Sequence, residues 1–138
     1  MIPDALSRLY ARAFPESRPW SADEFRSLLN DPHVFLEVRG AAFALGRVIA
    51  DEAELLTIAT APDYRRQGLA RACLSAFEDT AGARGASTAF LEVAADNTAA
   101  HLLYETQGYA IVARRPGYYH RANGAAADAL IMRRSFDA

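Results

Sequence analysis

The stretch that decides the fold is Tyr64-Arg65-Arg66-Gln67-Gly68-Leu69-Ala70-Arg71, because it joins a predicted strand to a predicted helix. Before it, residues 52–60 predict a strand, and the part 56–59 lacks polar alternation, which is typical of a strand buried on both faces. After it, apolar side chains recur at helical spacing from residue 69 onward, which predicts a helix packed on a sheet. The junction therefore predicts a sheet whose central strand leads directly into a covering helix.

The glycine turn at Gly68 suggests a chemical use for this junction. The first N–H groups of a helix have no partner inside it and lie at the positive end of its dipole, so they can hold a phosphate or pyrophosphate. Glycine lets the backbone approach such a ligand closely. The residues by themselves fit equally well with an ordinary helix start beside two solvated arginines, Arg65 and Arg66.

The rest of the chain predicts a single domain, residues 1–138, built from strands and helices. A first helix starts near residues 3–4, and a capping box of Ser21 and Glu24 begins a second. Further strands are predicted over residues 34–39, 41–50, 87–93, 109–112 and 129–132, and a last helix follows the cap Asn97 and ends at Gly108. This order predicts an α+β (mixed α/β) fold, with helices on both faces of a mixed sheet.

Composition excludes several functions. Fifteen basic against seventeen acidic residues give a net charge of −2, which argues against direct nucleic-acid binding. All fifteen basic residues are arginine, so a Walker-type phosphate loop, a pyridoxal Schiff base and a lysine base are excluded. A single cysteine and three scattered histidines predict no metal site. With no run of ~20 apolar residues, we expect no membrane span and a cytoplasmic protein.

Four side chains outside the glycine turn are candidates for chemistry. Glu92 is flanked by apolar residues on a predicted strand and is either a general base or a solvent-facing position. Tyr104 lies on the apolar stripe of its helix and is either a proton donor or a core residue. Asn97 is explained as a helix cap, although its amide could also touch a ligand. Cys73, on an inward helix face, is interpreted as a small hydrophobic residue.

Taken together, these residues resemble the GNAT superfamily of acetyl-CoA-dependent N-acetyltransferases. That family's pyrophosphate loop has the pattern Gln/Arg-x-x-Gly-x-Gly/Ala, and Arg65, Gly68 and Ala70 match it. The resemblance extends over most of the chain to the bacterial ribosomal-protein-alanine N-acetyltransferases of the RimI type. It is carried by Phe14-Pro15, Pro19-Trp20-Ser21, Asp51-Glu52-Ala53-Glu54-Leu55, Leu91-Glu92-Val93, Leu103-Tyr104-Glu105, Gly108-Tyr109, Arg114-Arg115 and Tyr118-Tyr119, in the family's order.

The resemblance implies a mostly antiparallel sheet, with Glu92 as general base and Tyr104 as general acid. It implies acetyl-CoA as the acetyl donor, no metal, and direct transfer without a covalent enzyme intermediate. The implied contacts to acetyl-CoA are the backbone of Ile58, Ala59 and Thr60, the loop Arg65, Arg66, Gln67, Gly68, Leu69, Ala70 and Arg71, and Asn97.

Three departures from the family pattern bear on the acceptor. The chain begins almost directly at a helix, so the first edge strand is expected to be missing or shortened, while Ala94 and Thr60 stand where relatives often have Arg and Val. The resemblance implies a protein N-terminus as acceptor, a ribosomal protein that begins with alanine. A small amine remains an alternative, as does a catalytically silent acyl-CoA-binding module. We expect a monomer or a homodimer.

Overall fold

The computed structural model describes residues 2–15, 18–120 and 124–136, and their helices and strands follow the predicted order. The elements are α1 (Ile2–Ala13), α2 (Ala22–Leu29), β1 (Val34–Arg39), β2 (Ala42–Ile49), β3 (Glu52–Thr60), a 3₁₀ turn η1 (Pro62–Tyr64), α3 (Leu69–Ala83), β4 (Thr88–Ala94), α4 (Thr98–Thr106), β5 (Ala110–His120) and β6 (Ala126–Ser135).

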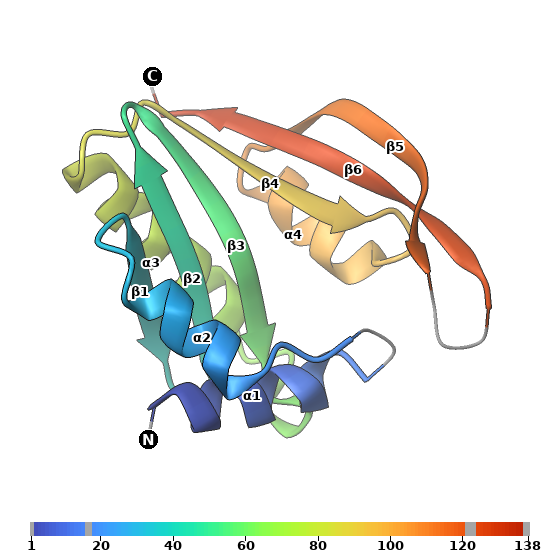
Figure 1. Ribbon diagram of the computed structural model, residues 1–138. Helices are drawn as coiled ribbons and strands as arrows, with labels where there is room; N and C mark the ends of the chain where they lie inside the picture. Colours follow the sequence, from blue (N-terminus) through green and yellow to red (C-terminus); the bar gives the residue numbers. More distant parts are fainter. Residues whose placement is uncertain (1, 16–17, 121–123, 137–138) are drawn as a thin grey trace.

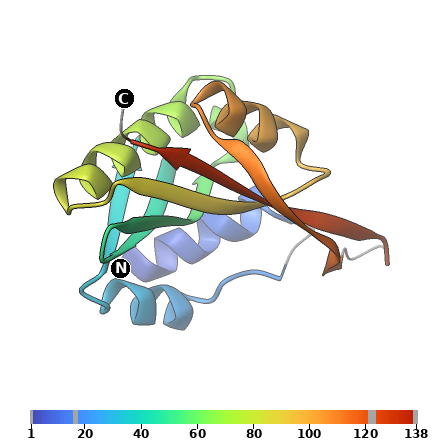
Figure 2. The same ribbon diagram turned by 90° about the horizontal axis from the view of Figure 1, so that it is seen from above.

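The strands form one sheet in the order β1-β2-β3-β4-β6-β5, in which only β3 and β4 run parallel. This confirms the predicted mixed, mostly antiparallel sheet. Helices α3 and α4 lie on one face and α1 and α2 on the other (Figure 2). Figure 1 shows α1 and α2 over the half of the sheet made by β1, β2 and β3, with no described helix in front of β4, β6 and β5 on that face.

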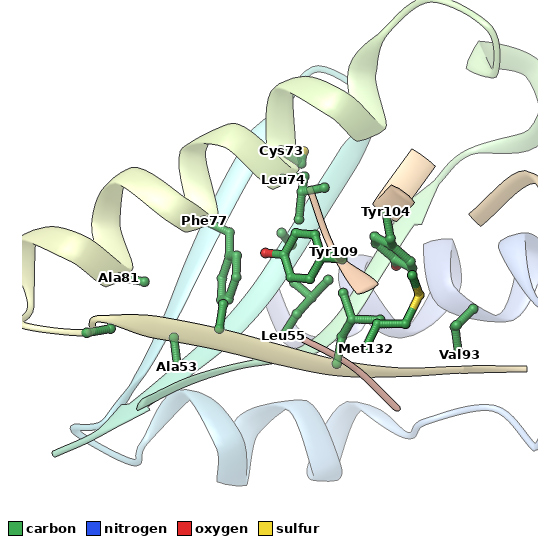
Figure 3. Close-up of a cluster of buried hydrophobic side chains, with 14 of the residues drawn as sticks. Ala53, Leu55, Cys73, Leu74, Phe77, Ala81, Val93, Tyr104, Tyr109 and Met132 are labelled. Carbon is green, nitrogen blue, oxygen red and sulfur yellow. The ribbon is translucent and has the colours of Figure 1, made fainter. Parts of the chain in front are cut away.

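Two hydrophobic clusters hold these layers together. The larger joins α3 and α4 to the sheet, and Figure 3 shows Phe77 and Leu74 of α3 above the strands. The smaller joins α1 and α2 to the opposite face, with Phe25 completely buried. Along β2, Ala44 belongs to the first cluster and Leu45 to the second, as the two-residue period of a strand requires.

Helix α2 begins with the capping box that the sequence predicts. The Ser21 hydroxyl accepts the backbone N–H of Glu24 at 3.1 Å, and the Glu24 carboxylate accepts the backbone N–H of Ser21 at 3.2 Å. Arg18 pairs with the same carboxylate at 2.8 Å. The hydrogen bond from Arg18, and then the one from Ser21, lower the pKa of Glu24 to about 2.

Helix α3 packs closely on the sheet because β2 has no side chain at Gly46. The rings of Phe35 and Phe77 stack at 5.8 Å between centroids, directly beside this glycine. A Cβ atom at residue 46 would stand 2.6 Å from the Phe77 ring and 2.7 Å from the Phe35 ring. Gly46 is therefore required by space, not by its backbone angles.

The structure differs from the sequence-based expectation in two places. The final hairpin is longer than the predicted strands 109–112 and 129–132, because β5 and β6 continue well past them. Residues 56–58 are only half-buried, although they were predicted to be buried on both faces. The expected absence of an initial edge strand agrees with the described residues, in which β1 forms that edge.

Candidate active site

The central feature of the site is the point where the parallel strands β3 and β4 part. Their pairing runs only from Glu52 opposite Thr88 to Leu55 opposite Leu91. Past this point the two strands diverge, as Figure 1 shows. The end of β3 thus faces a gap in the sheet, which explains why residues 56–58 remain half-buried.

A bulge in β3 accompanies the divergence. Leu45 of β2 pairs with Thr57, but the next residue, Gly46, pairs with Leu55, so Leu56 is an extra residue on β3. A bulge of this kind bends a strand and increases its twist. The bend lies at the last paired residue of β3 and turns the segment that contains Ile58, Ala59 and Thr60 away from β4.

Glu92 is the first residue of β4 beyond the paired segment. Leu91 and Val93 on either side point into the core beneath α3 and α4, so Glu92 lies on the uncovered face of β4. Its side chain is 30% exposed, and the guanidinium of Arg115 lies 3.6 Å from its Oε1. A carboxylate is therefore present beside the gap, on the side from which solvent has access.

Tyr104 lies on the opposite face of β4, in the core. It comes from α4, is 5% exposed, and packs edge-on against Tyr109 at 6.1 Å between ring centroids. Figure 3 shows it beside Met132. Burial raises the pKa of the Tyr104 hydroxyl, with a smaller contribution from Tyr119. The phenol therefore stays protonated at neutral pH.

The glycine turn begins α3 in the way that the sequence predicts. Gly68 is the N-cap of α3 and has φ +76°, a left-handed conformation that glycine adopts without strain. A Cβ atom here would meet nothing within 4 Å, so the backbone of the turn is open to solvent. Arg66 is also left-handed, at φ +66°. The free N–H groups at the start of Leu69–Ala83 fit a diphosphate group.

The remaining loop residues divide into two groups. Arg66, Gln67 and Arg71 are exposed around the start of α3. Arg65 instead donates from Nη2 to the carbonyl oxygen of Ala13 at 2.9 Å, so its side chain ties the loop to the end of α1. Leu69 and Ala70 form the first turn of α3 and are half-buried.

Asn97 caps α4, as its position predicts. Its Oδ1 accepts the backbone N–H of Ala100 at 3.2 Å, and its side chain is half-buried at the end of the β4 segment that carries Glu92. The fold thus brings residues from β3, β4, the start of α3 and the start of α4 to one end of the sheet.

Sequence reasoning assigned no role to Arg115 at the site or to Asp128, which contacts the β5 residues on either side of Arg115. The double arginine before Pro116 and Gly117 was the available signal, but only the folded hairpin brings Arg115 to Glu92. In the described part of the chain, no cluster of three or more His, Cys, Asp or Glu side chains could hold a metal ion. No helix among the described residues is both long and apolar enough to cross a membrane.

The sequence of this chain is similar to those of known acetyltransferases. The model of the acetyltransferase (GNAT) family matches residues 3–109. The ribosomal protein bS18-alanine N-acetyltransferase of Escherichia coli K12 is 42% identical over 118 residues, which are 83% of this chain and 79% of that protein. The N-alpha-acetyltransferase RimI of Mycobacterium tuberculosis H37Rv is 35% identical over 93% of this chain and 83% of its own length.

The fold agrees as closely as the sequence. The crystal structure of the ribosomal-protein-S18-alanine N-acetyltransferase from Escherichia coli superposes with a TM-score of 0.85 and 38% identity, covering 96% of this chain and 86% of that one. The parted strands and the glycine turn thus occur in a chain whose sequence and fold both match acetyltransferases. The chain belongs to the GNAT family and is an acetyl-CoA-dependent N-acetyltransferase.

Proposed function

We propose that this protein transfers the acetyl group of acetyl-CoA to the N-terminal α-amine of a protein that begins with alanine, in one direct step. The observation that supports this most is the position of Glu92, a carboxylate on the uncovered face at the point where β3 and β4 part. Two relatives support the α-amine of alanine as the acceptor: one is named as an alanine N-acetyltransferase of a ribosomal protein, and the other as an N-alpha-acetyltransferase.

Glu92 acts as the general base in this proposal. An α-amino group has an ordinary pKa of ~7.7–8.0 and is mostly protonated at neutral pH, so it must lose a proton before it can attack a thioester. Glu92 takes that proton from the acceptor ammonium, directly or through one water. The amine enters from the uncovered face, where the Glu92 side chain is accessible.

Residues around the gap hold the donor and complete the step. Gly68 and the first turn of α3 bind the diphosphate, and the backbone of Ile58, Ala59 and Thr60 binds the pantetheine arm and stabilises the oxyanion. The side chains of Arg66, Gln67 and Arg71 and the amide of Asn97 line this donor site. Arg65 contributes its backbone, while its side chain holds the loop against the end of α1. Both substrates are thus held side by side, so no nucleophile on the enzyme is required.

Tyr104 acts on the leaving group. It lies on the α4 side of β4, across that strand from Glu92. Its hydroxyl donates a hydrogen bond to the thiolate sulfur as negative charge develops there. The ordinary pKa of a thiol is roughly 8.5, below that of a buried tyrosine, so the hydroxyl helps most by stabilising the developing charge.

Release of free CoA tests the proposal. The purified protein is incubated with acetyl-CoA and, separately, with short peptides that begin with alanine and with a set of small amines. We expect release that depends on the peptides, and Glu92→Gln should lower kcat by about 10² or more while acetyl-CoA binding stays unchanged.

Each alternative gives a distinct result. Release of CoA with small amines alone would show that the acceptor is a small amine and would contradict a protein N-terminus as acceptor. Binding of acetyl-CoA without release in any mixture would indicate a silent acyl-CoA-binding module. Full turnover by the Glu92→Gln variant would remove Glu92 from the mechanism.

A further inference from the structure

Arg115 reaches Glu92 across the middle strand of the uncovered half of the sheet. On β6, Ala129 pairs with Arg115 on one side and with Ala94 on the other. Paired residues share a face, and so do residues two apart, so Arg115 and Glu92 lie on the same face. The strand between them carries only a methyl group at Ala129, which leaves room for the guanidinium to lie 3.6 Å from Glu92 Oε1.

The segment of β5 that contains Arg115 is fixed in place. The register between β5 and β6 shifts between Arg115 and Tyr119. At this irregularity, Asp128 of β6 accepts the backbone N–H of Gly117 at 2.9 Å and pairs with Arg114 at 2.6 Å. These two contacts, the Gly117 hydrogen bond first, lower the pKa of the Asp128 carboxyl. Asp128 therefore stays ionised at neutral pH and holds this irregular segment of β5.

Two other charged side chains on this face are engaged with partners of their own. Arg133, two residues from the register partner of Glu92 on β6, pairs with Glu52 at 2.9 Å. Glu54, on β3 opposite Phe90, pairs with Arg47 at 2.6 Å. From β5, Arg115 also lies over the ring of Tyr118 at 5.2 Å. Among the arginines that the structure describes, Arg115 is the one that contacts the carboxylate of Glu92.

We propose that Arg115 is a positioning residue for Glu92: it holds Oε1 of the carboxylate and leaves Oε2 turned toward the acceptor amine. This proposal rests on the proposed role of Glu92 as base. In the reaction, one ammonium N–H bond breaks and its proton passes to Oε2, while the nitrogen keeps the electron pair and attacks the thioester carbon. The carbon–sulfur bond breaks and its electrons stay on sulfur. The attacking nitrogen then releases a second proton, which neutralises the thiolate, so the products are the neutral amide and the free thiol of CoA. Arg115 exchanges no proton and keeps the carboxylate oriented.

The test compares Arg115→Ala, Arg115→Lys and a matched control, Arg133→Ala, which removes another arginine of the same face. kcat and KM are measured at neutral pH with an alanine peptide, and acetyl-CoA affinity is measured separately. Without the guanidinium of Arg115 the Glu92 carboxylate is free to rotate, so kcat should fall while acetyl-CoA affinity stays unchanged. We expect kcat at neutral pH to fall about tenfold.

The other variants separate orientation from simple structure. Arg115→Lys keeps a cation beside Glu92, so its kcat should return toward the wild-type value, whereas Arg133→Ala should keep the wild-type kcat. An unchanged kcat in Arg115→Ala, or the same loss in Arg133→Ala, would overturn the proposal. Glu92→Gln is assayed beside them: if it keeps turnover, the proposed base is wrong, and if it is inactive while Arg115→Ala is normal, only the role of Arg115 fails.

Discussion

The two side chains proposed to move or hold protons, Glu92 and Tyr104, differ in their exposure to solvent. Glu92 is open to solvent beside the gap, where an incoming amine can reach it. Tyr104 is buried on the other side of β4, where burial raises its pKa and keeps its proton. The same strand thus separates an accessible carboxylate, the proposed base, from a buried hydroxyl that keeps its proton.

Replacing Tyr104 by Phe tests the second group. The change removes only the hydroxyl, so the core packing against Tyr109 is retained. We expect kcat to fall by about 10² with little change in acetyl-CoA affinity. The matched control is Tyr109→Phe, which removes the hydroxyl of its packing neighbour and should keep kcat. Single-turnover kinetics distinguishes the two, and equal losses in both variants would argue against a role for Tyr104 in the step.

Residue 68 requires glycine because its backbone is left-handed, and Gly82 of the same helix provides a control without that backbone conformation. Gly68 has φ +76°, which an alanine adopts only with strain, whereas Gly82 has no such angle. Gly68→Ala should cost about 1 kcal/mol of stability and weaken acetyl-CoA binding. Gly82→Ala should stabilise by about 0.5 kcal/mol, since alanine favours helix. Urea unfolding and titration with acetyl-CoA measure both, and a weakened affinity in Gly82→Ala alone would contradict the account.

At the scale of elements, features formed by residues close together in the sequence could be predicted, whereas contacts between distant strands could not. Ser21 and Glu24 lie three residues apart, so their capping box follows from the sequence alone. Gly68 likewise marks the start of α3. Arg115 and Glu92 come from different strands, and a register shift in β5 decides whether they meet. No pattern in the sequence specifies that shift, so their contact could not be predicted.

The capping box gives α2 a stability that depends on pH. The folded-state pKa of Glu24 is about 2, below its ordinary value of 4.5. Its contribution is therefore complete above the ordinary value and is lost as pH falls from there to about 2. Glu24→Gln should be less stable than the wild type at pH 7 and equally stable near pH 2. Urea unfolding across this range measures the difference. A difference that is independent of pH would contradict the assigned ion pair.

At the scale of the whole molecule, helices cover the two faces of the sheet unequally. Helices α3 and α4 cover one face completely enough to bury Tyr104, while α1 and α2 cover only half of the other (Figures 1 and 2). The sequence predicted helices on both faces but not that one half stays open. The open half is made by β4, β6 and β5, and it begins where β3 and β4 part beside the bulge at Leu56.

In the proposed reaction, this chain acetylates the α-amine of an N-terminal alanine with Glu92 as base. The most direct measurement is mass spectrometric localisation of the acetyl group on an alanine-initiated peptide that also contains a lysine. Because this chain contains no lysine, the peptide supplies the only lysine amine in the mixture. We predict acetyl on the α-amine alone, formed about 10²-fold or more slowly with Glu92→Gln. Acetyl on the lysine side chain, or unchanged α-amine acetylation by Glu92→Gln, would contradict the account.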